Sequence, residues 1–271
     1  MNWCKTLLAT AALSFSGLTL AATELTFYGQ SGYKIVTEQG HVILIDPWIK
    51  NPKNSKGEAQ LKALEKVDLI LLTHGHFDHL GETVQIAEKT GARLVTNYDL
   101  GNVLVEKLGF PKAQFGFSST GNLGGQISLL NGDVKVGFTP ALHSSSVGVP
   151  MTDGTETTYG GTQTGFHIQL KNGPSFYHTG DTDAFSDMKL VNLFGPVDVM
   201  LTAIGDTFTM GPKRAAYAVK MVEPRKMVIP NHYGTFELLS GTPDAFAEAL
   251  KAQGIKTPMK ALQPGETITF E

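Results

Sequence analysis

The chain has 271 residues with 41% hydrophobic content, and its formal net charge is -3 at pH 7. This length allows a large buried core, and the lack of internal repeats or an obvious linker favours one domain over two. The slightly acidic balance and the absence of a Lys/Arg run exclude the broad basic surface of a nucleic-acid-binding protein. We therefore expect a small-molecule substrate, and a homo-oligomer is compatible with the composition.

Residues 1–22 have the pattern of a cleavable signal peptide. Lys5 supplies a positive charge, residues 7–20 are mostly apolar, and small residues suited to cleavage follow. The apolar stretch is too short and too rich in Ser, Gly and Thr for a permanent membrane anchor. We expect a periplasmic or secreted protein whose mature part, residues 23–271, is one domain. The only cysteine, Cys4, would leave with the signal, which excludes disulfides and thiolate metal ligands from the mature chain.

The first half of the mature chain alternates short apolar runs with helical patterns. Apolar and β-branched runs predict strands at residues 24–28, 33–37, 41–46, 67–72 and 92–96. Helical spacing of apolar residues predicts helices at 82–90 and 99–108, each ended by a glycine. A further helix is predicted after Ser55, which has capping-box spacing to Glu58.

The second half repeats this mixture with a different sequence. Two hairpins are predicted: strands at 126–130 and 133–139 flank Asn131-Gly132, and strands at 166–170 and 175–178 flank a Lys-Asn-Gly turn. Further strands are predicted at 197–204 and 226–229, and helices at 212–222 and 243–253. His167 alternates with apolar neighbours on its strand, so we expect its side chain to face solvent. Two β-rich regions with attached helices predict an α/β sandwich with helices on the outside.

Four side chains able to bind a metal follow the strand at 67–72 within six positions. They are His74, His76, Asp78 and His79. Three imidazoles and a carboxylate crowded together cannot satisfy one another in a dry core, but they suit a divalent cation with nitrogen and oxygen ligands. A polar loop that happens to contain three histidines is the less favoured alternative. The segment therefore predicts a metalloenzyme.

Three more candidate ligands, His143, Asp181 and His232, lie where later strands end and loops begin. Loops at strand ends let a rigid sheet aim side chains at one point. The seven candidates are too many for one tetrahedral metal, but they suit two divalent metals with Asp181 as the bridge. This thiolate-free set favours zinc and is also compatible with manganese, iron or nickel.

Further blocks surround these candidates: Leu44-Ile45-Asp46-Pro47 and the segments 160–166, 177–182, 204–212 and 232–236. Together with the motif at 74–79, they resemble the metallo-β-lactamase fold superfamily, and more narrowly its UPF0173-type branch of metal-dependent hydrolases, which is similar to the L-ascorbate-6-phosphate lactonases. The resemblance covers nearly all of the mature chain. It implies a four-layer αββα sandwich with the site at one edge of the paired sheets.

The resemblance also implies an assignment of ligands to metals. The first metal would be held by His74, His76 and His143, the second by Asp78, His79 and His232, and Asp181 would bridge the two. The chain departs from the branch in having Gly29-Gln30-Ser31 where Gly-His-Ser is usual, so the role of that histidine is lost or is taken by Gln30. Export is a second departure, because relatives of this kind are mostly cytoplasmic.

Four other residues have candidate roles near the site. Asp46 is predicted to hold a ligand imidazole or the ligand loop in place. His178 either lines the site or packs at a strand end. Asp206 belongs to the pocket, as the resemblance suggests, or caps a loop. Tyr233 either contacts the substrate or only excludes water.

The predicted function is hydrolysis of an ester-like bond, in a lactone, a phosphodiester or a related substrate. Two cations would lower the pKa of a bound water and hold the resulting hydroxide between them. Asp78 would orient this nucleophile and pass its proton to the leaving group. Hydrolysis of β-lactams is expected only as a minor activity, because the cysteine ligand of class B β-lactamases is absent. The alternative is a metal-binding or ligand-binding protein of the same fold without turnover.

Overall fold

The computed structural model describes residues 22–151 and 154–271. The predicted signal peptide therefore lies outside the described residues, except for Ala22. No helix within the two described stretches is both long and apolar enough to cross a membrane.

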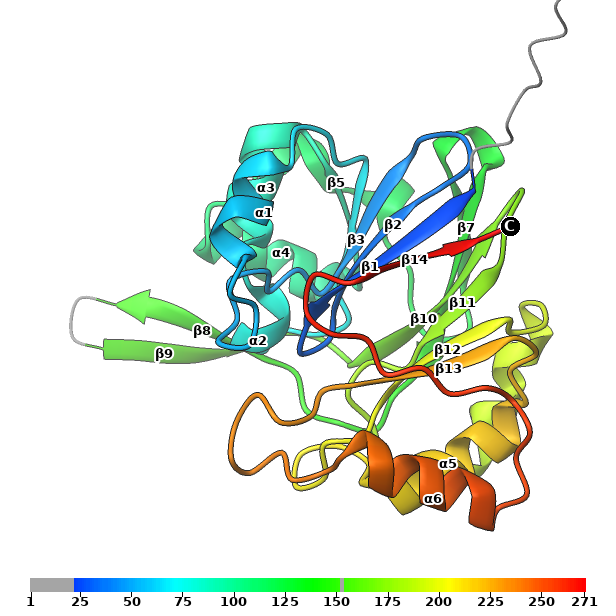
Figure 1. The fold of residues 1–271 in the computed structure, drawn as a ribbon. Coiled ribbons are helices and arrows are strands. Elements are labelled where there is room, and N and C mark those ends of the chain that lie inside the picture. The colour runs from blue at the N-terminus through cyan, green and yellow to red at the C-terminus, as the bar shows by residue number, and fades with distance from the viewer. Residues whose placement is uncertain (1–21, 152–153) are drawn as a thin grey trace, which may run out of the picture.

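Two six-stranded sheets form the centre of the molecule (Figure 1). The first has the order β14-β1-β2-β3-β4-β5 and is built from Thr23–Gly29 (β1), Gly32–Val36 (β2), Val42–Ile45 (β3), Leu69–Leu71 (β4), Arg93–Val95 (β5) and Thr267–Phe270 (β14). The second has the order β13-β12-β11-β10-β7-β6 and is built from Gln126–Leu129 (β6), Val134–Pro140 (β7), Thr164–Leu170 (β10), Ser175–His178 (β11), Val199–Ala203 (β12) and Met227–Asn231 (β13).

Both sheets share one pairing pattern, in which three antiparallel pairings are followed by two parallel ones. The parallel strands are β3, β4 and β5 in the first sheet and β11, β12 and β13 in the second. Parallel neighbours end at the same edge of a sheet, so the loops that follow them lie close together. This pattern brings the candidate ligand loops to one edge.

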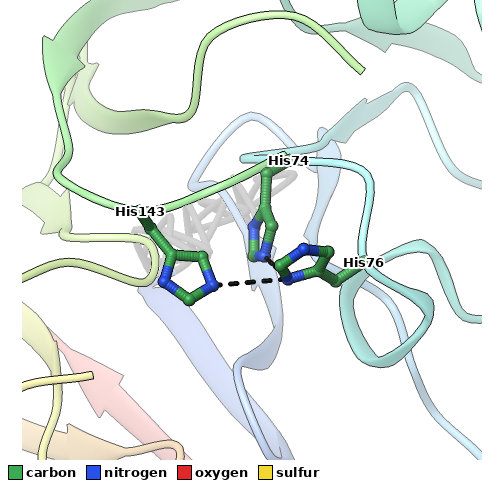
Figure 2. Close-up of side chains that lie close together, drawn as sticks. All are labelled: His74, His76 and His143. Atoms are coloured by element: carbon green, nitrogen blue, oxygen red, sulfur yellow. Dashed lines mark hydrogen bonds between the residues drawn. The ribbon is translucent and has the colours of Figure 1, made fainter. Parts of the chain in front are cut away.

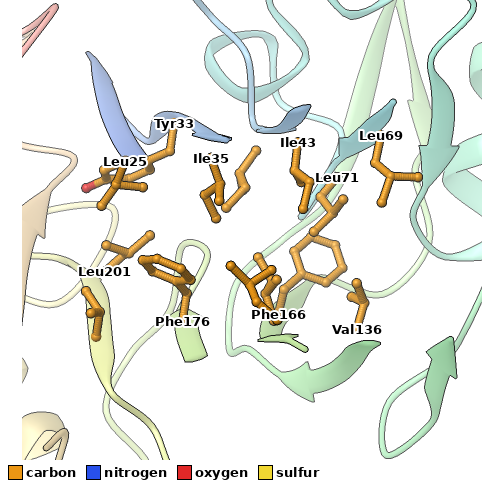
Figure 3. Close-up of a cluster of buried hydrophobic side chains, with 14 of the residues drawn as sticks. Leu25, Tyr33, Ile35, Ile43, Leu69, Leu71, Val136, Phe166, Phe176 and Leu201 are labelled. Atoms are coloured by element: carbon orange, nitrogen blue, oxygen red, sulfur yellow. The ribbon is translucent and has the colours of Figure 1, made fainter. Parts of the chain in front are cut away.

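Helices cover the outer face of each sheet (Figure 1). Gly57–Ala63 (α1), Thr83–Thr90 (α3) and Tyr98–Lys107 (α4) pack on the first sheet, and Pro212–Val222 (α5) and Pro243–Ala252 (α6) pack on the second. Ile43 and Phe166 belong to the apolar layer between the sheets (Figure 3), whereas Leu44, next to Ile43, belongs to the layer beneath the helices. Neighbouring strand residues are thus buried on opposite faces. The predicted four-layer sandwich is confirmed.

The predicted elements of both halves are present, with ends that differ by a few residues. The Asn131-Gly132 hairpin joins β6 to β7, and both turn residues have positive φ (58° and 92°). The capping box at Ser55 is wrong. Helix α1 begins at Gly57 without a side-chain cap, because Asn54 organises the preceding loop by donating to the carbonyl of Ile49 at 2.9 Å.

Several elements escaped the sequence patterns. They are the short helix Phe77–Leu80 (α2), the hairpin of Ser146–Met151 (β8) and Gly154–Tyr159 (β9) that projects from the body of the molecule, the 3-10 helix Ser186–Leu193 (η4) and the last strand, β14 (Figure 1). Each is short or lacks a clear apolar period, so pattern alone does not identify it.

The solvent-facing position predicted for His167 is wrong. Its side chain is completely buried on β10 and stacks on Phe194, with 6.0 Å between the ring centroids. The prediction assumed that one face of the strand meets water. In a four-layer sandwich both faces of each sheet are covered. The face that carries His167 is covered by η4 and by Phe194, which follows it.

Candidate metal centre

The histidine-rich segment follows β4 and turns at once into α2, for which His76 is the N-cap. This single helical turn places Asp78 and His79 on the side that faces the second sheet, while Phe77 points outward and is 68% exposed. Gly81 ends the turn with φ 41°, and a Cβ there would lie 2.4 Å from the Cα of Trp48. Only glycine allows the motif to approach the loop after β3 this closely.

Asp46, which follows β3 and is completely buried, orients two of the histidines. Its Oδ2 accepts hydrogen bonds from the Thr73 hydroxyl at 2.7 Å and from His79 Nδ1 at 2.7 Å, and its Oδ1 accepts from the Thr73 N–H at 2.9 Å. Because the Thr73 hydroxyl donates to Asp46, it accepts from His74 Nδ1 at 3.0 Å. Both imidazoles therefore carry a proton on Nδ1, which leaves Nε2 directed at the site as the atom that would bind a metal.

The first group of ligand atoms comes from both halves of the chain. His74 Nε2 lies 2.9 Å from His76 Nδ1, and His143 Nε2 lies 3.3 Å from the same atom. Figure 2 shows the three rings converging, two from the loop after β4 and one from the loop after β7. The loop of His143 is held by the Leu142 N–H, which donates to the Thr182 hydroxyl at 2.9 Å. These three histidines form one of the groups able to hold a metal ion.

The second group consists of Asp78, His79 and His232. Asp78 Oδ2 lies 3.7 Å from His79 Nε2 and 3.4 Å from His232 Nε2. Gln30 contacts both Asp78 and His232. Its side-chain Nε2 donates to Asp78 Oδ2 at 2.8 Å, and its backbone carbonyl accepts from the His232 N–H at 2.7 Å. Its backbone has the left-handed φ of 51°, and that of His232 has 53°, so two turns are strained to make this contact.

Asp181 lies between the two groups. Its Oδ2 is 4.0 Å from His74 Nε2 and 3.8 Å from His143 Nε2 on one side. On the other side it is 3.3 Å from His79 Nε2 and 3.0 Å from His232 Nε2. One carboxylate oxygen is thus within reach of four imidazoles from both groups.

Burial and neighbouring charge act against each other in this cluster. Burial lowers the pKa of His79 and His232, but the carboxylates, led by Asp181, raise the pKa of His79 well above its usual value and that of His232 to about 9. Burial raises the pKa of Asp78, yet His79 and His232 bring it to about 2. Protons therefore occupy this cluster when no cation does, and a cation that binds must displace them.

The donor set fits divalent metal ions. The buried Nε2 atoms of His79 and His232 and the Oδ1 atom of Asp181 have no hydrogen-bond partner among the described residues. Buried polar atoms without partners are costly, and here they converge on one region of the structure. A cation coordinated by imidazole and carboxylate would satisfy them. The structure thus brings together all seven predicted ligands.

His178 lies outside this cluster, and the packing alternative is the correct one. Its Nδ1 accepts from the Gly180 N–H at 3.1 Å, so Nε2 carries the proton and donates to the Ser31 carbonyl at 3.1 Å. The ring packs against Tyr33, with 5.7 Å between the centroids. Burial lowers its pKa, which favours this neutral form. His178 therefore ties the second sheet to the turn that carries Gln30.

Asp206 and Tyr233 are not at the ligand cluster either. Asp206 is exposed with φ 68°, and its Oδ1 accepts from the Thr207 N–H at 2.8 Å, so it caps a loop. Tyr233 packs against the apolar layer beneath α5 and α6. His232 has the left-handed φ of 53°, and the side chain of Tyr233 lies in this apolar layer while that of His232 lies among the ligands. Neither residue is among those described as lining the pocket over the ligands, and Asp206 borders a different hollow.

Five of the ligands, His76, Asp78, His143, Asp181 and His232, form the floor of an open pocket of about 530 Å³ whose walls are apolar apart from Ser144. The wall residues are Phe77, Phe208, Phe236, Leu238 and Leu239. Sequence reasoning missed this wall, and it also missed Thr73 as the residue that links Asp46 to His74. The available signals were the position of Thr73 directly before the motif and the concentration of aromatic residues in the loops after β12 and β13.

All seven candidate ligands lie in the part of the chain that matches a known protein family. Residues 41–233 match the beta-lactamase superfamily domain. A UPF0173 metal-dependent hydrolase of Thermodesulfovibrio yellowstonii is 54% identical over 250 residues, which cover 92% of this chain and 93% of that protein. A UPF0173 metal-dependent hydrolase of Anaeromyxobacter dehalogenans is 49% identical over 250 residues, covering 92% and 87%. A solved metallo hydrolase of the archaeon Ignicoccus hospitalis is 31% identical with a TM-score of 0.76, covering 92% of this chain and 99% of that one.

Proposed function

Because the chain belongs to the UPF0173 family of metal-dependent hydrolases, in the metallo-β-lactamase superfamily, we propose that it hydrolyses an ester-like bond with a pair of divalent metal ions. The observation that carries the two-metal proposal is the position of Asp181. One of its oxygens lies within 4.0 Å of imidazole nitrogens from both donor groups. A carboxylate in this position suits a bridge between His74, His76 and His143 on one side and Asp78, His79 and His232 on the other.

When bound, such cations supply an activated water and stabilise negative charge on the oxygen of the bond under attack. The residues of the chain would do the rest. Asp78 lines the pocket and is fixed by the Gln30 amide, so its carboxylate can orient the attacking water and carry a proton to the leaving group. Asp46 keeps the Nε2 atoms of His74 and His79 free for coordination. Zinc is the proposed metal, with manganese, iron or nickel as the alternatives.

The test is metal analysis together with turnover of a lactone and a phosphodiester panel. We expect about two metal ions per chain. Asp181→Asn should bind one ion or fewer and lose on the order of a hundredfold or more in kcat/KM, because both donor groups lose their shared ligand. Asp183→Asn is the matched control, since that exposed carboxylate pairs with Arg214 instead. Full metal content and full activity in both Asp181→Asn and His76→Ala would disprove the proposal.

We also propose that the protein is exported, on the basis of the N-terminal pattern. The support is the sequence of Lys5, the apolar stretch at 7–20 and the small residues before Thr23. N-terminal sequencing of the protein recovered from the periplasm or the medium should begin within a few residues of Thr23. A protein that keeps Met1 and stays in the cytoplasm would contradict this.

A further inference from the structure

The pocket above the ligands has a wall of exposed aromatic side chains. Phe77 is 68% exposed, Phe208 54% and Phe236 38%, and all three line the pocket. They reach it from separate segments: the start of α2, the loop after β12 and the loop after β13. Exposed apolar surface gathered in one place usually marks a binding site.

Three rings at this wall form one continuous cluster. Trp48, which is half-buried, lies 5.6 Å from Phe77 and stacks on Phe236 at 5.9 Å, and Phe77 lies 6.2 Å from Phe236 in an edge-to-face arrangement. Rings that support one another are held in place before a ligand arrives, which lowers the entropic cost of binding an apolar group. Trp48 thus fixes Phe77 and Phe236, two of the rings that the substrate would touch.

The pocket offers little to an anionic substrate. No Lys or Arg is among the residues described as lining it. The nearby Arg214 is paired with Asp183 and faces a different hollow. Three buried carboxylates, Asp46, Asp78 and Asp181, would also offset most of the charge of two divalent cations. A phosphate or a sugar phosphate would find no Lys or Arg side chain among the described residues that line the pocket.

We propose that the substrate is an uncharged lactone or carboxylic ester that carries an aryl or medium-chain alkyl group, which rests on Phe77, Phe208 and Phe236. This rests on the proposed hydrolytic function and narrows its substrate class. In the reaction, water adds to the acyl carbon, the bond from that carbon to the alcohol oxygen breaks, and a proton passes to the released oxygen. A carboxylic acid and an alcohol result, joined in one molecule when the substrate is a lactone. No oxidant or co-substrate other than water is needed.

The test uses γ-lactones that differ only in the length of the alkyl group on the ring, with bis(p-nitrophenyl) phosphate as the phosphodiester. For the metal-loaded full chain, we expect kcat/KM to rise by up to about fourfold per added methylene until the wall is covered. Phe236→Ala should lower the ratio of kcat/KM for the longest lactone to that for γ-butyrolactone by about tenfold. Phe117→Ala is the matched control, because Phe117 is 81% exposed and stacks on Tyr98 instead.

Trp48 provides a readout that does not require turnover. In a full chain with Trp3→Phe it is the only tryptophan, and its emission should shift when a long-chain lactone binds and stay unchanged with γ-butyrolactone at equal concentration. Lactone hydrolysis without dependence on chain length, or faster hydrolysis of the phosphodiester, would overturn the inference and leave the hydrolase proposal intact. Binding of long lactones without hydrolysis of any ester would support the apolar site and contradict the proposed function. Absence of both binding and hydrolysis of long lactones would overturn the inference.

Discussion

The first sheet reaches the candidate metal centre through one continuous segment, whereas the second sheet reaches it through three loops that are far apart in the chain. His74, His76, Asp78 and His79 all follow β4, and a single turn of helix that begins after His76 positions the last two. His143, Asp181 and His232 follow β7, β11 and β13 and meet only because the strands stand in the order that the sheet gives them. The same chemistry is thus supplied by local geometry on one side and by topology on the other.

The difference has a physical consequence for how the two sides are held. The local segment is fixed by hydrogen bonds to Asp46 and Thr73, next to it in the first sheet. The dispersed side depends on contacts that cross between the halves, such as the Gln30 carbonyl with the His232 N–H and the Ser31 carbonyl with His178. Substitutions at Asp46 or Thr73 should disturb the orientation of the ligand side chains. Substitutions at the contacts that cross between the halves should disturb the position of one sheet relative to the other.

Among the residues that hold the ligands in place, the largest effect is expected at Asp46. Asp46→Asn removes the charge that fixes the His79 ring and the Thr73 hydroxyl, and metal affinity should fall by about 10- to 100-fold. Competition with a chromogenic chelator measures this. The matched control is Asp68→Asn, because Asp68 also accepts from a backbone N–H, that of Val42, at the other end of β3. It should alter stability and leave metal affinity within about twofold of wild type. Equal losses in the two variants would remove the distinction between orientation and general stability.

A smaller effect is expected at Gln30, where the two sides meet. Gln30→Ala leaves Asp78 without its amide donor, so the second metal ion should bind up to about tenfold more weakly while the first is unaffected. Titration calorimetry of the metal-free protein resolves the two events. Gln30→His should recover at least part of the affinity, because an imidazole N–H can donate to the same oxygen. Two unchanged binding events in Gln30→Ala would show that Asp78 does not need this support.

The smallest effect is expected at His178, and it depends on pH. Burial holds the pKa of His178 below its ordinary value of 6.5, so its contribution to stability is complete above about pH 6.5 and is lost as the pH falls below that value. For one proton, the free energy of unfolding falls by at most about 1.4 kcal/mol per pH unit. Urea unfolding of the metal-free protein between pH 7.5 and 5.5 should therefore show a steeper loss for wild type than for His178→Gln. Parallel curves would contradict the neutral, fully hydrogen-bonded ring.

The sequence predicted the local side of the comparison better than the dispersed side. The histidine motif and the strand before it are visible as a pattern, and the glycine-ended helices α3 and α4 are equally clear. His167 shows the limit, because whether a strand face meets water depends on η4, which has no clear period. Asp206 and Tyr233 show it again. Tyr233 directly follows His232, and Asp206 lies two residues before Phe208. Positive φ values at Asp206 and His232 turn the chain, and sequence order does not reveal which way a side chain then points.

The cluster of Trp48, Phe77 and Phe236 joins segments from both halves of the chain, since Phe236 follows β13 while the other two follow β3 and β4. The apolar surface that would bind a substrate therefore also contributes contacts that hold the two sheets together at the edge where the pocket opens. A substitution that widens the pocket also removes packing between the two halves of the chain and so lowers the stability of the fold. Variants of this protein that accept bulkier substrates should accordingly need a compensating change elsewhere, which ties the evolution of selectivity to that of stability.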